Sequence, residues 1–541
     1  MHRNKESQTK IIQNARIYTV NSTFDVVESM AMCAGRIVGI GNIATLRKSF
    51  PDAILIDMEG RCVYPGLFDA HCHLEWYARS LGEANLLGCT SETDMLHLLS
   101  QYRQQNPHLP AIIGRGWDQN LWGKKDFPDN TALNRLFPDI PVMLTRIDFH
   151  TALVNQRALD LVNFLPTTHI DGGMIAVEQG KLTGLLFDNA IVPIAAALPP
   201  LPTAERERLL LLAQQNCLEA GLTSLTNALT GSDEWACYQA LEHQNKLLLR
   251  LSCMIDGMEE NAKQFFFKTG IVRSEHLHVQ CIKYFVDGTL GSRSAWLLQD
   301  YADAPAQRGL PIHESHFFEQ QLRECFEAGF QVATHAIGDQ ANRFVLDHYA
   351  RQLGTDNRHR RWRIEHVQVL HPDDLPRFGK HGIIPSVQPA HATSDSSWVG
   401  ERLGAERLPT AYRLRDLLLQ NGHLPIGSDF PIEPIQPLLG FYAAIARQNV
   451  QGLSASVFLP EQALTRREAL CAMTIWAAHA CFEDDLLGSL EVGKYADFVV
   501  TNKDLLTMPL LNLPKEKIAQ TWIGGQVVYQ SPELSGATTF S

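Results

Sequence analysis

The chain has 541 residues, of which 45% are hydrophobic and 20% are charged, and its formal net charge is -12. This composition is typical of a globular protein with a large core, and the length leaves room for more than one domain. The negative charge argues against nucleic acid or an anionic membrane as a partner, because either would require a basic face. The 11 cysteines show neither regular spacing nor a C-x-x-C pair, so we expect buried thiols in a reducing compartment.

The sequence contains no apolar segment with the length of a membrane span. It starts with the polar stretch MHRNKESQTK, and no apolar run approaches the ~20 residues that a helix needs to cross a bilayer. We therefore expect a cytoplasmic protein. A homo-oligomer is compatible with these features.

Both ends of the chain are rich in short β segments. Near the start, KIIQNARIYTV and AMCAGRIVGIG alternate with turn signals, and near the end GSLEVGKYADFVV and IAQTWIGGQVVYQ do the same. Two β-rich ends around a central α/β region suggest a small β-sandwich domain that both termini form, from residues 1–66 and 485–541. Residues 67–484 then form the larger domain.

The strand that opens the larger domain runs directly into two histidines, His71 and His73, in VYPGLFDAHCH. Because side chains alternate along a strand, we expect both imidazoles on one side, within reach of one metal ion, and Cys72 on the other side. The stretch that follows, at about residues 74–200, is too long for a single connection between a strand and a helix. We interpret it as an inserted lobe.

Four later β segments each end in one more residue that can bind a metal. They are HVQCIKYFVDG with Lys283, FQVATHAIGD with His335, WRIEHVQVL with His366, and HLPIGSDFP with Asp429. Polar ligands at the ends of strands that helical segments separate are typical of the carboxyl end of a (β/α)8 barrel. The sequence therefore predicts an α/β fold, a TIM-like barrel over residues 67–484, with the lobe inserted after its first strand.

Each of these residues has an alternative role when it is considered alone. A single histidine is more often a core residue, and Asp429 would also suit the N-cap of a helix. A lysine in an apolar strand needs a compensating group, since a buried ammonium costs several kcal/mol, and a salt bridge from Lys283 to Asp287 would provide one. Glu365, beside His366, is expected on the opposite face in a structural role. The set as a whole favours a metal centre.

The chemistry of such a centre follows from its residue types. Imidazole nitrogen and carboxylate oxygen suit zinc and similar divalent ions, and a catalytic site keeps one position open for water. A bound divalent ion lowers the pKa of water from ~15.7 toward ~7. Asp429 is placed to hold the metal or its water, to take the proton of that water, and to hand it to a leaving nitrogen.

Seven motifs follow one another along the chain: GLFDAHCH, KYFVDGTLGSRSA (Lys283 to Ala295), ATHAIGD, RIEHVQ, SVQPAH, IGSDFP and GSLEVGKYADFVV. In this combination and order the chain resembles the amidohydrolase superfamily. Within it, the chain is similar to amidohydrolase family 3, which includes N-substituted formamide deformylases. The likeness extends over nearly the whole chain.

The resemblance implies a hydrolase with zinc or another divalent metal, one or two ions per chain. In relatives with two metals, the lysine at the position of Lys283 is carboxylated and bridges both ions. The resemblance implies a carbamate on Lys283, with a catalytic role for Lys283 beside Asp429. The expected metal ligands are His71, His73, Lys283, His335, His366 and Asp429.

Substrate contacts are expected from polar and aromatic clusters outside this ligand set. Trp117 and His150 lie in such clusters within the lobe, Arg293 follows the Lys283 strand, and His391 lies in QPAHATSD. Arginine offers a bidentate fork for a carbonyl or carboxylate, and tryptophan offers a flat apolar wall. Packing of the lobe is an equally fair explanation for the two clusters inside it.

We expect a metal-dependent hydrolase that cleaves a carbon–nitrogen bond of the amide type, other than a peptide bond, in a small-molecule substrate. A ring-amine deaminase of the same superfamily is an alternative. Many such deaminases place a Glu shortly after the histidine of the fifth strand, whereas His335 is followed by Ala336, Ile337, Gly338 and Asp339, of which only Asp339 could replace it. A third hypothesis is a non-catalytic binding module, because a fold alone does not guarantee a function.

Overall fold

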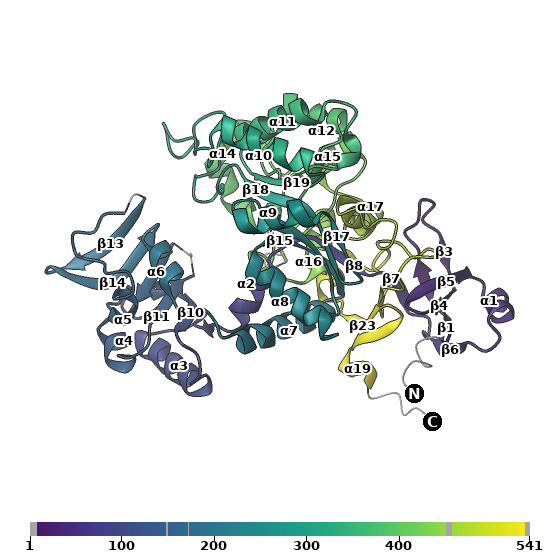
Figure 1. The fold of residues 1–541 in the computed structure, drawn as a ribbon, viewed down its shortest axis with the longest axis horizontal. Helices are drawn as coiled ribbons and strands as arrows, with labels where there is room; N and C mark the ends of the chain where they lie inside the picture. The colour runs from purple at the N-terminus through teal and green to yellow at the C-terminus, as the bar shows by residue number, and fades with distance from the viewer. Residues whose placement is uncertain (1–7, 148–149, 171, 451–456, 536–541) are drawn as a thin grey trace. The chain divides into compact units, whose positions relative to one another are not determined.

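The computed structural model describes residues 8–147, 150–170, 172–450 and 457–535. Its contacts divide the chain into two compact units, Met1–Tyr77 with Ala213–Ser541, and Ala78–Leu212. Figure 1 shows one set of strands in the first unit with helices packed around it, and further strands near the two termini of the chain. None of the helices in the described residues combines the length and the apolar character that crossing a membrane requires.

The first unit is built around a parallel sheet whose strands are neighbours in chain order. They are β8 (Leu67–Cys72), β15 (Leu222–Thr230), β16 (Arg250–Asp256), β18 (Leu277–Phe285), β19 (Gln331–Ala336), β20 (Arg363–His366) and β21 (Ile384–Ser386), with β17 (Val272–Arg273) antiparallel to β18. An extended segment, residues 424–429, lies between β21 and β8. Its Ile426 pairs in parallel with Val387 and accepts a hydrogen bond from Ala70 N at 3.1 Å. The sheet is a nearly closed parallel barrel, as the sequence predicted.

Helices connect the barrel strands, because two parallel neighbours require a crossover. After the strands come α8 (Ser232–His243), α9 (Glu260–Thr269), α10 (Ser315–Glu327), α11 (Asp339–Leu353), α12 (Leu375–His381), α13 (Pro389–Ser394), α14 (Val399–Arg407), α15 (Leu414–Asn421), α16 (Pro437–Ala446), α17 (Arg466–Ala472) and α18 (Ile475–Ala480). In α11, Ala341, Val345 and Tyr349 share one buried face, at the spacing that the helical period gives. This face packs against the barrel, where Tyr349 Oη lies 2.7 Å from Thr334 Oγ1 of β19.

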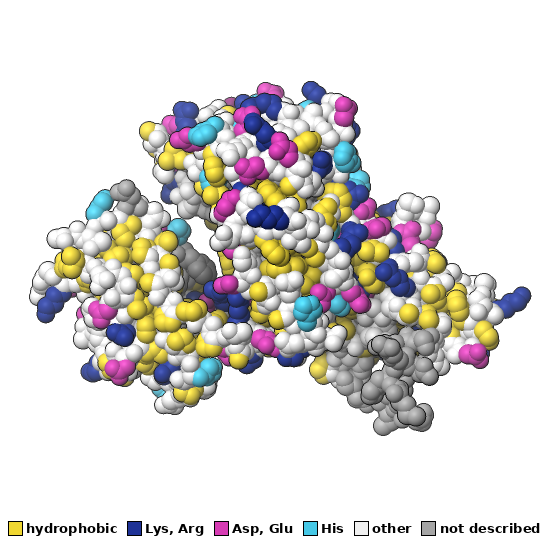
Figure 2. All heavy atoms as spheres, in the orientation of Figure 1, with side chains coloured by type: hydrophobic (Ala, Val, Ile, Leu, Met, Phe, Trp, Pro, Cys, Tyr) yellow, Lys and Arg dark blue, Asp and Glu magenta, His cyan; other side chains and the backbone are white. Residues whose placement is uncertain are grey.

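The outer helices carry both signs of charge. On the face that Figure 2 shows, Lys and Arg side chains are interspersed with Asp and Glu over α10, α11 and α12. Among the charged residues of these helices, Arg323 pairs with Glu319 at 3.5 Å within α10, and Arg377 of α12 pairs with Asp347 of α11 at 2.6 Å. Charge on this face is therefore mixed rather than concentrated in one sign.

Segments from both ends of the chain form two further sheets of the first unit. One has the order β5 (Arg36–Gly41), β4 (Ser29–Cys33), β1 (Lys10–Gln13), β6 (Ile54–Asp57), and the other β24 (Gln526–Gln530), β23 (Ile518–Ile523), β22 (Phe498–Thr501), β7 (Cys62–Pro65), β2 (Arg16–Tyr18), β3 (Val26–Val27). Residues of both sheets, among them Ile12, Met30, Val63 and Phe498, share one hydrophobic core. The helices α1 (Ile43–Ser49) and α19 (Pro532–Ser535) complete these terminal segments.

The second unit is a six-stranded sheet with helices. Its strand order is β13 (Gly173–Glu178), β14 (Lys181–Asp188), β12 (Thr151–Val154), β11 (Val142–Arg146), β10 (Ile112–Trp117), β9 (Ala84–Asn85), and its helices are α3 (Glu92–Gln105), α4 (Thr131–Leu136), α5 (Gln156–Leu159) and α6 (Ile191–Ala197). The helices α2 (Leu74–Leu81) and α7 (Thr203–Glu219) span its boundaries. The sequence placed an inserted lobe at about residues 74–200, and the compact unit runs from Ala78 to Leu212.

A buried ion pair joins the barrel to the terminal sheets. Arg250 opens β16, and its Nε and Nη2 lie 2.5 and 3.1 Å from the two carboxylate oxygens of Asp497, beside β22. Asp497 also accepts a hydrogen bond from Gly524 N, and the Arg250 guanidinium stacks on the Tyr495 ring at 3.7 Å. Both charged side chains are almost fully buried, so each depends on the other for compensation.

We expect Asp497→Ala to lower the free energy of unfolding by about 3–5 kcal/mol, because it leaves the Arg250 charge buried without its partner. Urea unfolding followed by circular dichroism measures this loss. Glu319→Ala removes an exposed pair on α10 and is the control, for which little change is expected. Equal stability of the two variants would contradict a structural role for the buried pair.

Candidate metal centre

The two histidines of the first barrel strand lie together at its carboxyl end. His71 Nε2 and His73 Nε2 are 3.6 and 3.1 Å from the same oxygen, Oδ1 of Asp429. Cys72 is buried on the other side, where its Sγ contacts the carbonyl of Thr226 at 3.5 Å. Strand alternation therefore turns both imidazoles toward one point, as expected for the H-x-H pattern.

Asp429 is the last residue of the segment that completes the barrel. Its backbone N donates to the carbonyl of His71 at 2.7 Å, which fixes the carboxylate beside the two histidines. Gly427 permits this approach, since a Cβ at that position would lie 2.4 Å from His71 N. Ser428 is fixed by Asp69, whose carboxylate accepts hydrogen bonds from its N and Oγ. Asp429 itself has φ 63°, a left-handed conformation that aspartate tolerates and that is enriched at functional sites.

His335 and His366 come from adjacent strands, β19 and β20. Their ring centroids are 4.6 Å apart, and the His366 ring lies 4.9 Å from that of His71. Burial lowers the pKa of His335 to about 3 and places that of His366 well below its usual range. Both imidazoles are therefore neutral, the state in which the ring can bind a metal.

His391, which the sequence placed among the substrate contacts, lies in this cluster of ligands. It is on α13, with Nε2 3.2 Å from Asp429 Oδ2 and Nδ1 3.3 Å from Glu433 Oε1. Burial opposes its protonation, but the hydrogen bonds to Asp429 and Glu433 raise the pKa of His391 to about 10. Glu433 was missed at the sequence level, although it stands four residues after Asp429 in the DFPIEP segment.

Two groups of side chains in the described residues have the spacing of a metal site. One consists of His71, His73 and Asp429, and the other of His366, His391 and Asp429. Asp429 Oδ1 is buried and has no hydrogen-bond partner among the described residues, and the same is true of His73 Nδ1. A donor set of imidazoles and one carboxylate with an unsatisfied oxygen fits a divalent cation of the zinc type.

Lys283 is fully buried on β18. Its Nζ has no hydrogen-bond partner among the described residues, and burial lowers the pKa of Lys283 to about 8. The salt bridge to Asp287 that the sequence allowed is wrong. The Asp287 carboxylate instead accepts hydrogen bonds from the backbone N of Trp296, Ile337 and Gly338 at 2.8–3.0 Å.

Glu365 faces the barrel interior, so the expectation that it points away from the site is wrong. Its Oε2 lies 2.5 Å from His71 Nδ1, and Arg363 holds both of its oxygens at 2.7 and 3.1 Å. Burial opposes its ionisation, but Arg363 and His71 hold the pKa of Glu365 far below its usual range. The expectation failed because His366 has φ 76°, which interrupts the alternation and lets both neighbours reach the site.

The other predicted substrate contacts each have a partner within their own unit. Trp117 is fully buried in the core of the second unit, and its Nε1 donates to Leu144 O at 2.8 Å. It is a packing residue, the alternative that the sequence left open. His150 belongs to the same unit and lies 2.8 Å from Asp188. Arg293, in the loop after β18, makes a bidentate ion pair with Asp303 at 3.1 and 2.8 Å.

Comparison with known proteins identifies the family. The amidohydrolase family pattern matches residues 55–529. The chain belongs to the amidohydrolase family. It is 32% identical to Protein LONG AFTER FAR-RED 3 of Arabidopsis thaliana, with 96% of this chain and 91% of that protein covered, and 24% identical to N-substituted formamide deformylase of Arthrobacter pascens, with 96% and 98% covered. The crystal structure of a metal-dependent hydrolase from Pyrococcus furiosus matches with a TM-score of 0.81 and 27% identity, covering 92% of this chain and all of that one.

This membership confirms the resemblance read from the motifs and gives the site its context. The motifs with His71, His73, Lys283, His335, His366 and Asp429 all lie inside the matched residues. In this amidohydrolase, the six residues lie at or near the carboxyl ends of the barrel strands. TIM-barrel enzymes have their active sites at this end of the barrel.

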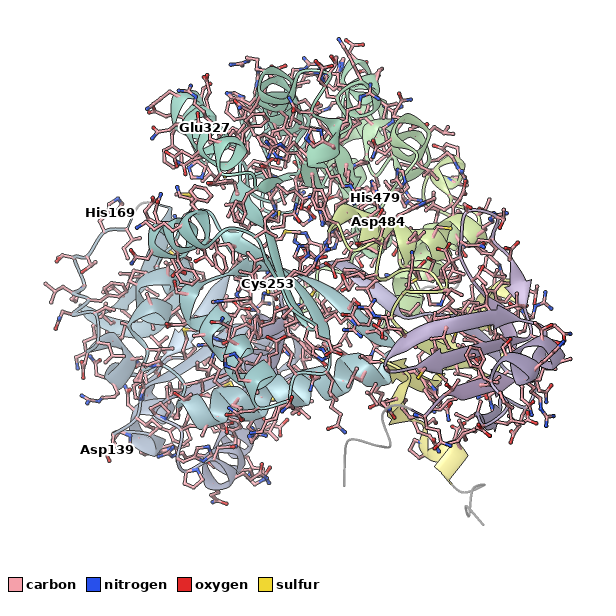
Figure 3. The ribbon with its side chains drawn as sticks, turned by 45° about the vertical axis from the view of Figure 1, so that its right-hand side comes forward. Asp139, His169, Cys253, Glu327, His479 and Asp484 are labelled. Carbon is pink, nitrogen blue, oxygen red and sulfur yellow. The ribbon has the colours of Figure 1, made fainter. Side chains whose placement is uncertain are left out.

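Glu365→Gln tests whether the buried carboxylate positions His71 for a metal. Since a carboxylate on Nδ1 fixes the ring orientation and leaves Nε2 free, its loss should weaken metal affinity about 10–100-fold. The measurement is competition with a chromophoric chelator. The control is Asp484→Asn. Asp484 also lies against an imidazole Nδ1, that of His479 at 3.0 Å, and against Arg361, but this group is away from the site. Figure 3 labels His479 and Asp484. Equal affinities in both variants would contradict this role.

Lys283→Met should stabilise the metal-free, bicarbonate-free protein at pH 7 by about 1–3 kcal/mol. The folded pKa of about 8 lies below the ordinary value of 10.5, so between these values the unfolded chain binds more protons. The stability of the unsubstituted protein therefore rises with pH through this window, and the advantage of the variant shrinks. Urea unfolding at pH 7 and pH 10 measures both effects, with the exposed Lys517→Met as control. A variant less stable than the unsubstituted protein at pH 7 would refute the prediction.

Proposed function

We propose that the protein is a metal-dependent amidohydrolase that cleaves a carbon–nitrogen bond of the amide type in a small molecule. The observation that carries this proposal is the buried convergence of His71, His73 and Asp429, with an unsatisfied carboxylate oxygen between them. The family and the fold are those of metal-dependent hydrolases. Amide-type specificity is supported by the similarity to N-substituted formamide deformylase over almost the full length of both chains.

The residues that would hold a divalent cation, zinc or a similar ion, are His71, His73, His335, His366 and Asp429. When bound, the ion supplies a Lewis acid for the scissile carbonyl and makes hydroxide available near neutral pH. The chain contributes the fixed imidazole orientations, and the buried position of the ligands limits the access of bulk water.

Asp429 acts as the general base and then as the general acid. Burial opposes its ionisation, but the hydrogen bond from His391 and the nearby imidazoles hold the pKa of Asp429 well below its usual range. The carboxylate is therefore ionised and ready to accept a proton at neutral pH. Oδ1, the oxygen without a hydrogen-bond partner among the described residues, takes the proton of the attacking water and returns it to the leaving nitrogen.

Lys283 carries a carbamate in the active protein. Its Nζ is fully buried without a hydrogen-bond partner in the described part of the chain, and the lowered pKa makes the neutral, nucleophilic amine accessible near neutral pH. Addition of carbon dioxide to that amine forms an N–C bond, releases one proton and converts the side chain into an anionic oxygen ligand. The carbamate would remove the cost of a buried ammonium and extend the set of metal ligands.

Deamination of a ring amine is less well supported. Asp339, the candidate for proton transfer after His335, already accepts hydrogen bonds from the backbone N of Leu298 and Gln340 at 2.8 and 3.0 Å. It stands at the first turn of α11, where its position serves the start of the helix. Amide hydrolysis requires no such additional carboxylate.

Metal analysis combined with substrate turnover tests the proposal. We expect purified protein to contain zinc-like ions by elemental mass spectrometry and to hydrolyse at least one member of a panel of N-formyl, N-acetyl and N-acyl amines. Chelation should abolish turnover, and metal with bicarbonate should restore it. Release of ammonia from ring amines alone would instead support the deaminase.

Asp429→Asn should lower kcat about 10²–10⁴-fold, because the amide cannot accept the proton. The control is Asp374→Asn, which removes another buried carboxylate, one that Arg343 and Arg377 hold at the start of α12. Turnover of Asp429→Asn at the rate of the unsubstituted protein would refute the assigned role. The absence of both metal and activity in the unsubstituted protein would favour a binding module.

A further inference from the structure

Three imidazoles of the cluster share one arrangement at Nδ1. In each, Nδ1 lies against the oxygen of a neighbouring side chain: His71 with Glu365 at 2.5 Å, His366 with Gln388 at 2.8 Å, and His391 with Glu433 at 3.3 Å. An acceptor on Nδ1 holds the proton there, orients the ring and leaves the Nε2 lone pair free for a metal. His391 thus has the same supporting contact as two of the expected ligands.

The two oxygens of Asp429 face different histidines. Oδ1 is 3.1 Å from His73 Nε2 and 3.6 Å from His71 Nε2, whereas Oδ2 is 3.2 Å from His391 Nε2. Donor atoms that share one ion are separated by distances of this size, since metal–ligand bonds are about 2.0–2.2 Å long. One carboxylate can therefore serve two cation positions, one at each oxygen.

The donor atoms around Oδ2 form a group of their own. His366, His391 and Asp429 each offer one ligand atom within 4.8 Å of the others, and all three side chains are buried. Among the described residues this group does not include His335. The position at Oδ2 is thus built from side chains of the sixth strand, of the helix after the seventh, and of the closing segment.

We propose that His391 is a metal ligand, and that a second divalent cation binds between His391 Nε2, His366 Nε2 and Asp429 Oδ2. Gln388 and Glu433 are positioning residues that hold the two imidazoles. The inference rests on the proposed metal dependence and deepens it, because it assigns His391 as a metal ligand instead of a substrate contact. Lys283, when carboxylated, would complete the set from the neighbouring strands.

The competing structure is an imidazolium. A protonated His391 would donate to Asp429 through Nε2 and to Glu433 through Nδ1, and it would position Asp429 without touching a metal. The two structures differ in what binding releases: a cation at His391 displaces the Nε2 proton, whereas the imidazolium keeps it. Metal stoichiometry and proton release therefore separate them without any assay of activity.

The experiment is a titration of chelator-treated protein with Co²⁺, followed by elemental analysis after desalting and by the visible absorption of the ion. The unsubstituted protein should retain two cations per chain. His391→Asn should retain one, and Glu433→Gln should bind the second cation about 10–100-fold more weakly, since only the support of the ring is lost. Proton release, measured in weak buffer, should fall by about one per chain in His391→Asn.

His278→Asn is the matched control. His278 is also buried, and its Nδ1 lies 2.9 Å from Glu483, but it stands at the start of β18, at the opposite end of the strand from Lys283. It should retain two cations. Circular dichroism and thermal melting confirm that each variant is folded before its metal content is compared.

The outcomes separate the inference from the proposed function. Two cations with unchanged affinity in both His391→Asn and Glu433→Gln would overturn the inference and support the imidazolium. One cation in the unsubstituted protein would also overturn the second position, while metal dependence would stand. The absence of any bound cation in the unsubstituted protein would refute the proposed function itself.

Discussion

Closure of the barrel by residues 424–429 is the constraint on which the site depends. This segment hydrogen-bonds to β8 through Ala70 N and to the β21 side through Val387, and its last residue, Asp429, donates its N–H to His71 O. The backbones approach so closely that Gly427 has no room for a side chain. The carboxylate is thereby fixed beside histidines from the opposite end of the barrel sequence. The candidate metal ligands converge because this segment closes the barrel.

Many ionisable groups are buried together in the barrel interior, and the cost of removing their charges from water must be compensated. Linked ion pairs and hydrogen bonds provide this compensation. Arg363 neutralises Glu365 and also donates to Ala70 O and Ser386 Oγ at 2.8 Å. Glu365 in turn holds His71. A buried ion pair contributes little net stability compared with well-packed apolar residues, so its value here lies in fixing the orientation of a ligand. Lys283 stands beside this network without a hydrogen-bond partner in the described residues, which marks it as chemically available.

Buried side chains of this cluster differ in charge state according to their neighbours. Imidazoles without a carboxylate on both sides, such as His335, are held neutral, whereas His391 between Asp429 and Glu433 favours its protonated form. Asp429 remains ionised because His391 and the other imidazoles surround it. Environment, rather than residue type alone, thus decides which of these groups is charged and which is neutral.

Periodicity and motif order in the sequence determined the barrel and its family. They also placed His71, His73, Lys283, His335, His366 and Asp429 at strand ends, because strand alternation and the parallel α/β pattern are local properties that a single sequence carries. Only the tertiary structure decided which of these side chains meet. The left-handed φ of His366 turned its ring toward the side that Glu365 faces, and the loop after Asp429 brought Glu433 to His391. Trp117 became a core residue because its neighbours in the second unit enclose it. These outcomes depend on contacts between segments far apart in the chain, for which local sequence patterns contain no signal.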